Sequence, residues 1–226
     1  MATRHFSPEL FAFLRDLADH NERTWFHQNK ERYETDVREP ALQFIEDYGE
    51  RLPKLSPYLE ANARTVGGSL FRIQRDTRFS KDKTPYKLNS GVHFRHAWAQ
   101  DAHAPGLYLH LEPRNSFMGM GIWRPQAKVA NQIRVHIDEN PDRWVEALDA
   151  FGDELHLEGE SLKRPPRGFD KQHRLLTDLK RKDFLARAGL KQANITKASF
   201  IDEFDRLAHR GQPFLGFLSQ ALEIPF

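Results

Sequence analysis

Two short segments in the middle of the chain decide the fold class: LYLHLE at residues 107–112 and FMGMGIW at residues 117–123. In both segments large apolar residues alternate with residues of another kind, which is the period-two pattern of a β-strand with one buried face. The residues between them, 113–116, read PRNS and are typical of a turn. The pattern therefore predicts an antiparallel β-hairpin in which Leu109 lies opposite Met120 and Leu111 lies opposite Met118.

The two faces of this hairpin differ in chemistry. One face is apolar and is expected to lie on the core; it carries Leu107, Leu109, Leu111, Met118, Met120 and Ile122. The other face sets Tyr108 and His110 opposite Gly119 and Gly121, and two glycines at i and i+2 leave a shallow slot. Close approach of a ligand is one reason for glycine inside a strand, and a packed Trp or helix that fills the slot is the alternative.

Helical spacing dominates on both sides of the strands. Helices are expected to start at Ser7-Pro8, Thr24, Pro40, Pro125, Asn140-Pro141, Ser199 and Pro213, and further β-rich segments lie at 70–74 and 91–95. The Pro- and Arg-rich stretch 163–168 is expected to be a surface loop, because the residues after it would make a marginal domain. The sequence thus predicts an α+β fold in a single domain, 1–226. Its central, mainly antiparallel sheet would have at least four strands, flanked by N-terminal and C-terminal helices.

Composition excludes several function classes. The chain has 34 Lys and Arg against 32 Asp and Glu, so it is not a polybasic nucleic-acid coat. Its mean hydropathy is −0.71, and neither a membrane span nor a signal-peptide apolar core is evident, which leads us to expect a cytoplasmic protein without a membrane partner. With no cysteine, and with His93, His96 and His103 at no ligand spacing, we expect solvated histidines and no metal or other cofactor.

One segment, residues 70–96, is strongly basic. It holds seven Lys and Arg against two Asp, a local charge of +5, and its centre reads RDTRFSKDKTPYK at 75–87. Arginine offers a planar fork of donors for carboxylate or phosphate, lysine adds a movable charge, and Ser80 adds a hydroxyl. Asp76 lies between two arginines and is expected to have a lowered pKa if it pairs with them. A solvated loop whose charges pair with the acidic surface is the alternative interpretation.

From these patterns we assign candidate roles. Asp76 and His110 are the candidate proton carriers. The candidate ligand-binding residues are Arg72, Arg75, Arg78, Ser80, Lys81, Lys83, Tyr86, Lys87, Tyr108, Gly119 and Gly121, with Trp25 or Trp123 as further stacking partners. We expect five of the cations (Arg75, Arg78, Lys81, Lys83 and Lys87) to converge on one anion site beside His110 and the glycine slot. Arg72 would share the sheet face of His110, while Phe71 and Ile73 would turn to the core.

Several of these motifs occur together in one family. NERTWF at 21–26, FRI at 71–73, the 75–87 run, YLHL at 108–111 and GMGIW at 119–123 resemble the domain of unknown function 2461 family. The resemblance extends over about residues 6–222, which implies one domain along the whole chain. It implies no activity and supplies no catalytic residues.

Three functions remain open at this stage. The first is binding of, or catalysis on, a small phosphorylated or carboxylated ligand through the basic segment. The second is a single-stranded nucleic-acid-binding module, because aromatic residues interleave with the cations. The third is a structural or interaction protein that docks an acidic partner. Whether the protein is an enzyme stays open.

Overall fold

An antiparallel sheet forms the centre of the molecule. The computed structural model describes residues 3–64, 66–98 and 104–226. Within these residues six strands lie in the order β1-β2-β3-β4-β6-β5, and every pairing is antiparallel. Their bounds are β1 Leu59–Glu60, β2 Ser90–His96, β3 Gly106–Leu111, β4 Phe117–Ile122, β5 His156–Glu158 and β6 Phe184–Gly189.

The predicted hairpin is present as β3 and β4, but its register differs from the expected one by two residues. Leu109 pairs with Met118 rather than with Met120. The reason is a turn over 112–115, in which Pro113 takes the second position, Arg114 has a φ of 66° and the Asn115 amide donates to the Glu112 carbonyl. Since a shift of two residues keeps every side chain on its face, the expected core face is confirmed, and all six of its side chains are fully buried.

The N-terminal helices follow closely on one another. They are α1 Pro8–Asp19, α2 Arg23–Gln28, α3 Lys30–Tyr33, the π-helical turn η1 Glu34–Arg38, α4 Glu39–Gly49 and α5 Leu52–Leu55. Pro8 takes the first helical position of α1, as predicted. Thr24 is expected to cap α2, but the cap is Glu22, two residues earlier, whose carbonyl accepts the first helical hydrogen bond, from the Phe26 amide. Thr24 therefore lies inside the helix.

The later helices follow the strands in the order expected. Helices α6 Ala127–Glu139 and α7 Pro141–Asp149 come after β4, and α10 Phe200–Arg210 and α11 Gln212–Ala221 come near the C-terminus. Two short helices, α8 Leu176–Leu179 and α9 Gln192–Ile195, flank β6. No helix of the described residues is long and apolar enough to cross a bilayer.

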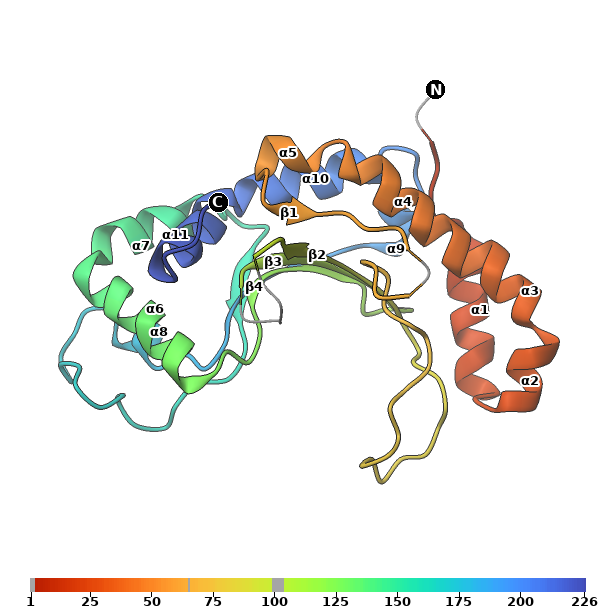
Figure 1. Ribbon diagram of the computed structural model, residues 1–226, viewed down its shortest axis with the longest axis horizontal. Helices are drawn as coiled ribbons and strands as arrows, with labels where there is room; N and C mark the ends of the chain where they lie inside the picture. The colour runs from red at the N-terminus through yellow and green to blue at the C-terminus, as the bar shows by residue number, and fades with distance from the viewer. Residues whose placement is uncertain (1–2, 65, 99–103) are drawn as a thin grey trace.

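The core lies on one face of the sheet. Figure 1 shows α4, α5 and α10 along one side of the strands, while the other side faces the space between the segments around residues 70–88 and 156–182. Phe44 of α4, Phe94 of β2 and Phe204 of α10 are fully buried together, so both ends of the chain pack on the sheet. One cluster of buried side chains runs from Phe6 to Ala221. The protein is therefore a single α+β domain, and 163–168 is a loop within it.

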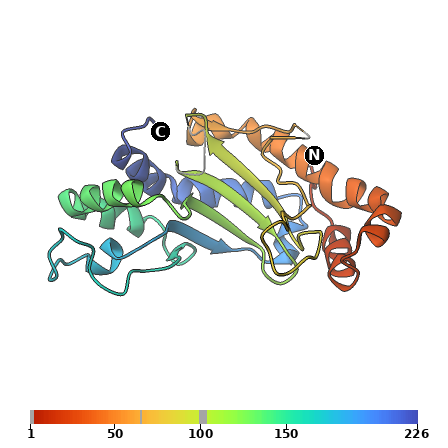
Figure 2. The same cartoon turned by 60° about the horizontal axis from the view of Figure 1, so that its bottom comes forward.

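The basic segment forms an arm rather than a regular strand. Leu70 makes an isolated bridge to Val92, and residues 73–75 then pair with 85–87 through the Gln74–Tyr86 bridge and two backbone hydrogen bonds. We call residues 73–87 the basic hairpin. Its tip extends from the open side of the sheet in Figure 1, and in Figure 2 the arm lies in front of the ends of the strands.

Candidate functional site

A cavity of about 640 Å³ opens on the face of the sheet that the helices leave free. Its lining includes four residues that the hairpin pattern singled out: Tyr108, His110, Gly119 and Gly121. Aromatic walls are added by Phe117 and Trp123 of the β4 segment and by Phe71. A cavity of this size, mainly apolar with a few polar groups, is typical of a small-molecule site.

A chain of hydrogen bonds runs along one wall of the cavity. The Tyr108 hydroxyl lies 3.0 Å from His110 Nδ1, and His110 Nε2 lies 3.1 Å from Glu112 Oε2. Asn115 donates to the same carboxylate at 2.7 Å. Because a carboxylate only accepts, His110 Nε2 carries the proton, and Nδ1 accepts the hydrogen of Tyr108. The three side chains lie on alternate positions of β3 and its end, which is why they share one face.

Burial shifts the pKa values of His110 and Tyr108. It lowers the pKa of His110 below its usual value, an effect that the nearby Glu112 carboxylate partly opposes. It also raises the pKa of Tyr108 to about 12. Near neutral pH the imidazole is therefore neutral and the phenol keeps its proton. In that state Tyr108 donates its hydrogen to the Nδ1 lone pair of His110.

Arg187 of β6 is the main residue of the cavity that sequence reasoning missed. Its guanidinium lies 4.3 Å from the ring centroid of Phe117, and it donates to Asn115 Oδ1 at 2.8 Å and approaches Glu158 at 3.4 Å. Its Nε atom is buried and has no hydrogen-bond partner among the described residues. The signal was the sequence FLARAG at 184–189, where buried Phe and Ala alternate with Leu, Arg and Gly.

Cations lie against the aromatic walls of the cavity. Besides Arg187 on Phe117, the charged end of Lys87 lies 5.3 Å and that of Arg95 5.8 Å from the ring centroid of Phe71. Arg124 lies 4.7 Å from the Trp123 ring. Of these four cations, Arg187 is among the residues that line the cavity, where it lies 3.4 Å from the Glu158 carboxylate; the other three lie against the aromatic rings.

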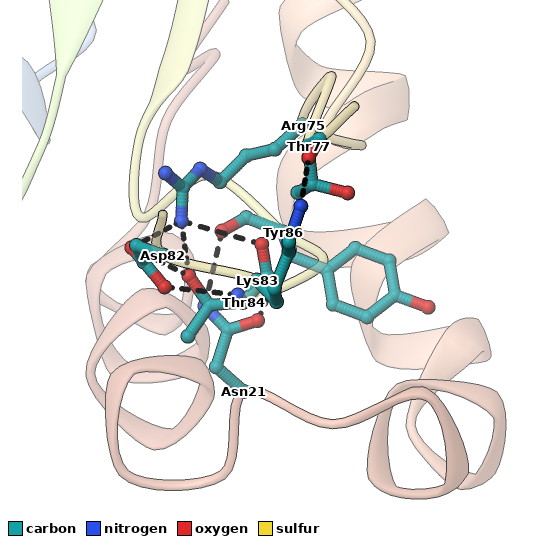
Figure 3. Close-up of polar contacts among 7 residues, drawn as sticks. All are labelled: Asn21, Arg75, Thr77, Asp82, Lys83, Thr84 and Tyr86. Carbon is teal, nitrogen blue, oxygen red and sulfur yellow. Dashed lines mark hydrogen bonds and ion pairs between the residues drawn. The ribbon is translucent and has the colours of Figure 1, made fainter. Parts of the chain in front are cut away.

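The basic hairpin is held rigid by its own charges. Figure 3 shows the Arg75 guanidinium directed at Asp82, 2.5 Å away, and at Thr84, and Lys83 donating to the Thr77 carbonyl at 2.9 Å. At its base the side-chain amide of Asn21 makes two hydrogen bonds of 3.0 Å with the backbone of Tyr86.

None of the described hairpin residues is among those that line the cavity with His110. Arg75, Lys83 and Tyr86 border a separate hollow of about 490 Å³ beside the turn between α1 and α2. The exposed tip carries Asp76, Arg78 and Lys81, with half-buried Ser80 among them. The expected convergence of five cations does not occur in this structure, because Asp82 pairs with Arg75 and Asp76 pairs with Arg78 within the hairpin.

Three further expectations can be compared with the structure. Arg78 lowers the pKa of Asp76, as predicted for a paired carboxylate. Phe71 lines the cavity instead of turning to the core, whereas Ile73 is buried as expected. Arg72 is exposed, and its carbonyl accepts a hydrogen bond from Lys87.

Three histidines are expected to be solvated, but the two of them that the structure describes, His93 and His96, are not. His96 is buried and its Nε2 lies 2.7 Å from the Pro225 carbonyl, while His93 lines the cavity. His103 lies outside the described residues. In the part of the chain that the structure describes, no three His, Asp or Glu side chains gather as a metal site would require.

Comparison with known proteins identifies the family. A family model described as "Conserved hypothetical protein (DUF2461)" matches residues 9–217, nearly the whole chain. The chain belongs to the DUF2461 family. No curated protein and no solved structure matches it. The description of the DUF2461 family names no activity.

Proposed function

We propose that this DUF2461 protein binds a small organic anion, a carboxylate or a phosphate ester, in the sheet cavity and exchanges a proton with it through Tyr108 and His110. The observation that supports this proposal is the hydrogen-bonded pair Tyr108–His110, backed by Glu112, in the wall of an aromatic cavity that Arg187 also lines.

The proton step follows from the tautomer of His110. A ligand hydroxyl that donates its proton to the Tyr108 oxygen would be deprotonated as Tyr108 passes its own proton to His110 Nδ1. The resulting imidazolium would face Glu112, whose negative charge stabilises it. The reverse transfer returns the proton. Tyr108 is thus the group at the ligand, and His110 and Glu112 act through it.

Recognition of the anion falls to Arg187, a cation among the residues that line the cavity. A charged hydrogen bond contributes about 1.5–3 kcal/mol, so replacing Arg187 by Gln is expected to weaken binding of an anionic ligand about tenfold or more. Such a loss of affinity would indicate that the anion binds in the cavity and not on the basic hairpin.

The test is a binding panel of aromatic carboxylates, aliphatic carboxylates and phosphate esters, read as ligand-induced thermal stabilisation. Arg187→Gln should reduce the stabilisation, whereas Arg78→Ala, a matched loss of one Arg on the exposed hairpin, should leave it unchanged. Tyr108→Phe should preserve binding and abolish proton exchange with a bound hydroxy acid. If Arg78→Ala weakens binding and Arg187→Gln does not, the proposal is wrong.

The hairpin tip favours a second candidate function, contact with single-stranded nucleic acid. Phe79 is 95% exposed, and the Arg78 guanidinium lies 5.9 Å from its ring centroid. An exposed ring beside cations is the arrangement on which unpaired bases stack. A labelled oligothymidylate should bind, Phe79→Ala should weaken binding, and log K should fall with log salt at about 0.7 per neutralised phosphate. If the oligothymidylate does not bind and the tip captures only an acidic protein, the result would favour the third function, docking of an acidic partner.

A further inference from the structure

Gly91 of β2 lies opposite His110 of β3, and the space above it, on the face of the sheet that the helices leave free, is filled by Tyr108. A Cβ atom at Gly91 would lie 2.6 Å from the Tyr108 hydroxyl, 3.0 Å from Cε2 of the same ring and 3.1 Å from Cδ2 of Phe71. Real Cβ atoms essentially never approach another heavy atom to less than 3.0 Å. The hydroxyl therefore occupies its place because residue 91 has no side chain.

The backbone does not require a glycine at this position. Gly91 has no positive φ, and its three nearest atoms all belong to side chains. Gly121 differs, because its φ is +112° and a Cβ there would lie 2.2 Å from the Phe184 carbonyl. The missing side chain at Gly91 thus makes room for neighbouring side chains and not for the main chain.

The contact of Tyr108 with His110 needs this room. Alternate residues of a strand lie about 7 Å apart, yet the Tyr108 hydroxyl is 3.0 Å from His110 Nδ1, so the phenol leans along β3 toward His110. On the β4 side the imidazole is covered by the Phe117 ring, which stacks on it at 4.6 Å between centroids. The β2 side, where Gly91 pairs with His110, receives the hydroxyl instead.

From this geometry we infer that Gly91 is a positioning residue: because it lacks a side chain, the Tyr108 hydroxyl reaches Nδ1 of His110, the contact through which a proton is exchanged with the ligand. The inference rests on the proposed function for the use of this contact, whereas the contact itself can be tested without a ligand. A methyl group at residue 91 would displace the hydroxyl and leave the strand in place, because the hydroxyl is the far end of a flexible side chain.

The experiment follows His110 by NMR in Gly91→Ala protein whose histidines carry ¹⁵N. The hydrogen bond from Tyr108 favours the neutral imidazole, so its loss should raise the pKa of His110 by about 0.4–1, as expected for one neutral hydrogen bond. The ¹⁵N shift of Nδ1 should move toward that of an unbonded nitrogen. Glu112 and Arg187, whose charges also act on His110, are the same in every variant. The His110 signals are assigned by their absence in His110→Gln.

Two variants separate positioning from a general disturbance of the sheet. Tyr108→Phe removes the same hydroxyl, so it should raise the pKa of His110 as much as Gly91→Ala does, and combining the two substitutions should add little. Gly189→Ala is the matched control. This glycine of β6 pairs with Phe117, and a Cβ there would meet nothing within 4 Å, so the pKa of His110 should not change.

In the ligand assays Gly91→Ala should behave like Tyr108→Phe. It should keep the anion affinity of the native protein, because Arg187 is unchanged. Proton exchange with a bound hydroxy acid should slow about a hundredfold, the lower end of what a general acid–base group contributes.

The outcomes distinguish this inference from the function on which it rests. An unchanged pKa and Nδ1 shift of His110 in Gly91→Ala, or fully additive effects in the double variant, overturn the inference, while Arg187→Gln still tests the function. If Gly91→Ala is too unstable to titrate, adding Tyr108→Phe should make it more resistant to chemical denaturation, and equal instability overturns the inference. If the native protein binds no acid of the panel, the proposed function is wrong, and the titration alone decides the positioning of Tyr108.

Discussion

The cavity changes the pKa of one of its own lining residues, His93. It lines the cavity from β2, and Arg95 Nε donates to its Nδ1 at 3.3 Å. Burial, assisted by the charge of Arg95, lowers the pKa of His93 to about 4. The folded protein therefore keeps this imidazole neutral at a pH where the unfolded chain would protonate it.

This difference predicts how stability depends on pH. Because the unfolded state binds a proton below about pH 6.5 and the folded state only near pH 4, the free energy of unfolding should fall as pH drops through that window. The contribution of His93 is up to about 3 kcal/mol, fully present above pH 6.5. Chemical denaturation at several pH values measures it. His93→Asn should flatten the slope, and an identical slope in both proteins would contradict the assignment.

Contacts at its base attach the basic hairpin to the N-terminal helices. Its base stacks Tyr86 on Phe26 at 4.1 Å between ring centroids, and Asn21 makes two hydrogen bonds with the Tyr86 backbone. Asn21 belongs to the turn before α2, so a residue distant in sequence orients the whole arm. The pairs Arg75–Asp82 and Arg78–Asp76 then set the shape of the tip.

Removing this clamp should loosen the hairpin alone. Asn21→Ala is expected to lower the free energy of unfolding by about 1–3 kcal/mol, since it leaves two backbone groups of Tyr86 without partners. Amide hydrogen exchange should accelerate at Arg75, Tyr86 and Lys87, but not in β4 or β6. Asn21→Asp, which retains only an acceptor, should give an intermediate effect. Unchanged exchange at Tyr86 would show that Phe26 alone holds the arm.

Packing of both chain ends onto one sheet defines the whole molecule. Phe204 of α10 is fully buried against Phe44 and Tyr48 of α4, at centroid distances of 5.4 and 4.8 Å, and against Phe94 of β2 at 6.1 Å. Early and late helices therefore stabilise each other through the sheet. Since the helices occupy one face, the opposite face is left for the cavity.

Phe204→Ala should reduce stability throughout the molecule. We expect the free energy of unfolding to fall by about 3–5 kcal/mol, as for other large-to-small core changes. Circular dichroism and tryptophan fluorescence should report one coincident transition. The matched control is Phe79→Ala, the same substitution at an exposed position, which should change stability by no more than about 0.5 kcal/mol. Two separate transitions for Phe204→Ala would contradict a single cooperative core.

Features that depend on local residue spacing could be predicted from the amino-acid sequence. Alternation at 107–111 and 117–122 placed Tyr108, His110 and Gly119 on one face and the core side chains on the other, because side-chain direction in a strand repeats every two residues. Proline and cap residues likewise placed α1, α7 and α11. Membership in the DUF2461 family was also evident from the motifs.

Contacts between distant segments could not be predicted in this way. Arg187 lies beside Gly119 because β6 pairs with β4, a contact that the intervening helices α6 and α7 make non-local. The sequence anticipates that Asp76 pairs with a neighbouring arginine, whereas Asp82 meets Arg75 only once the hairpin turns back on itself. Local spacing fixes the face on which a side chain lies, whereas its partners depend on burial of apolar surface between segments far apart in the chain.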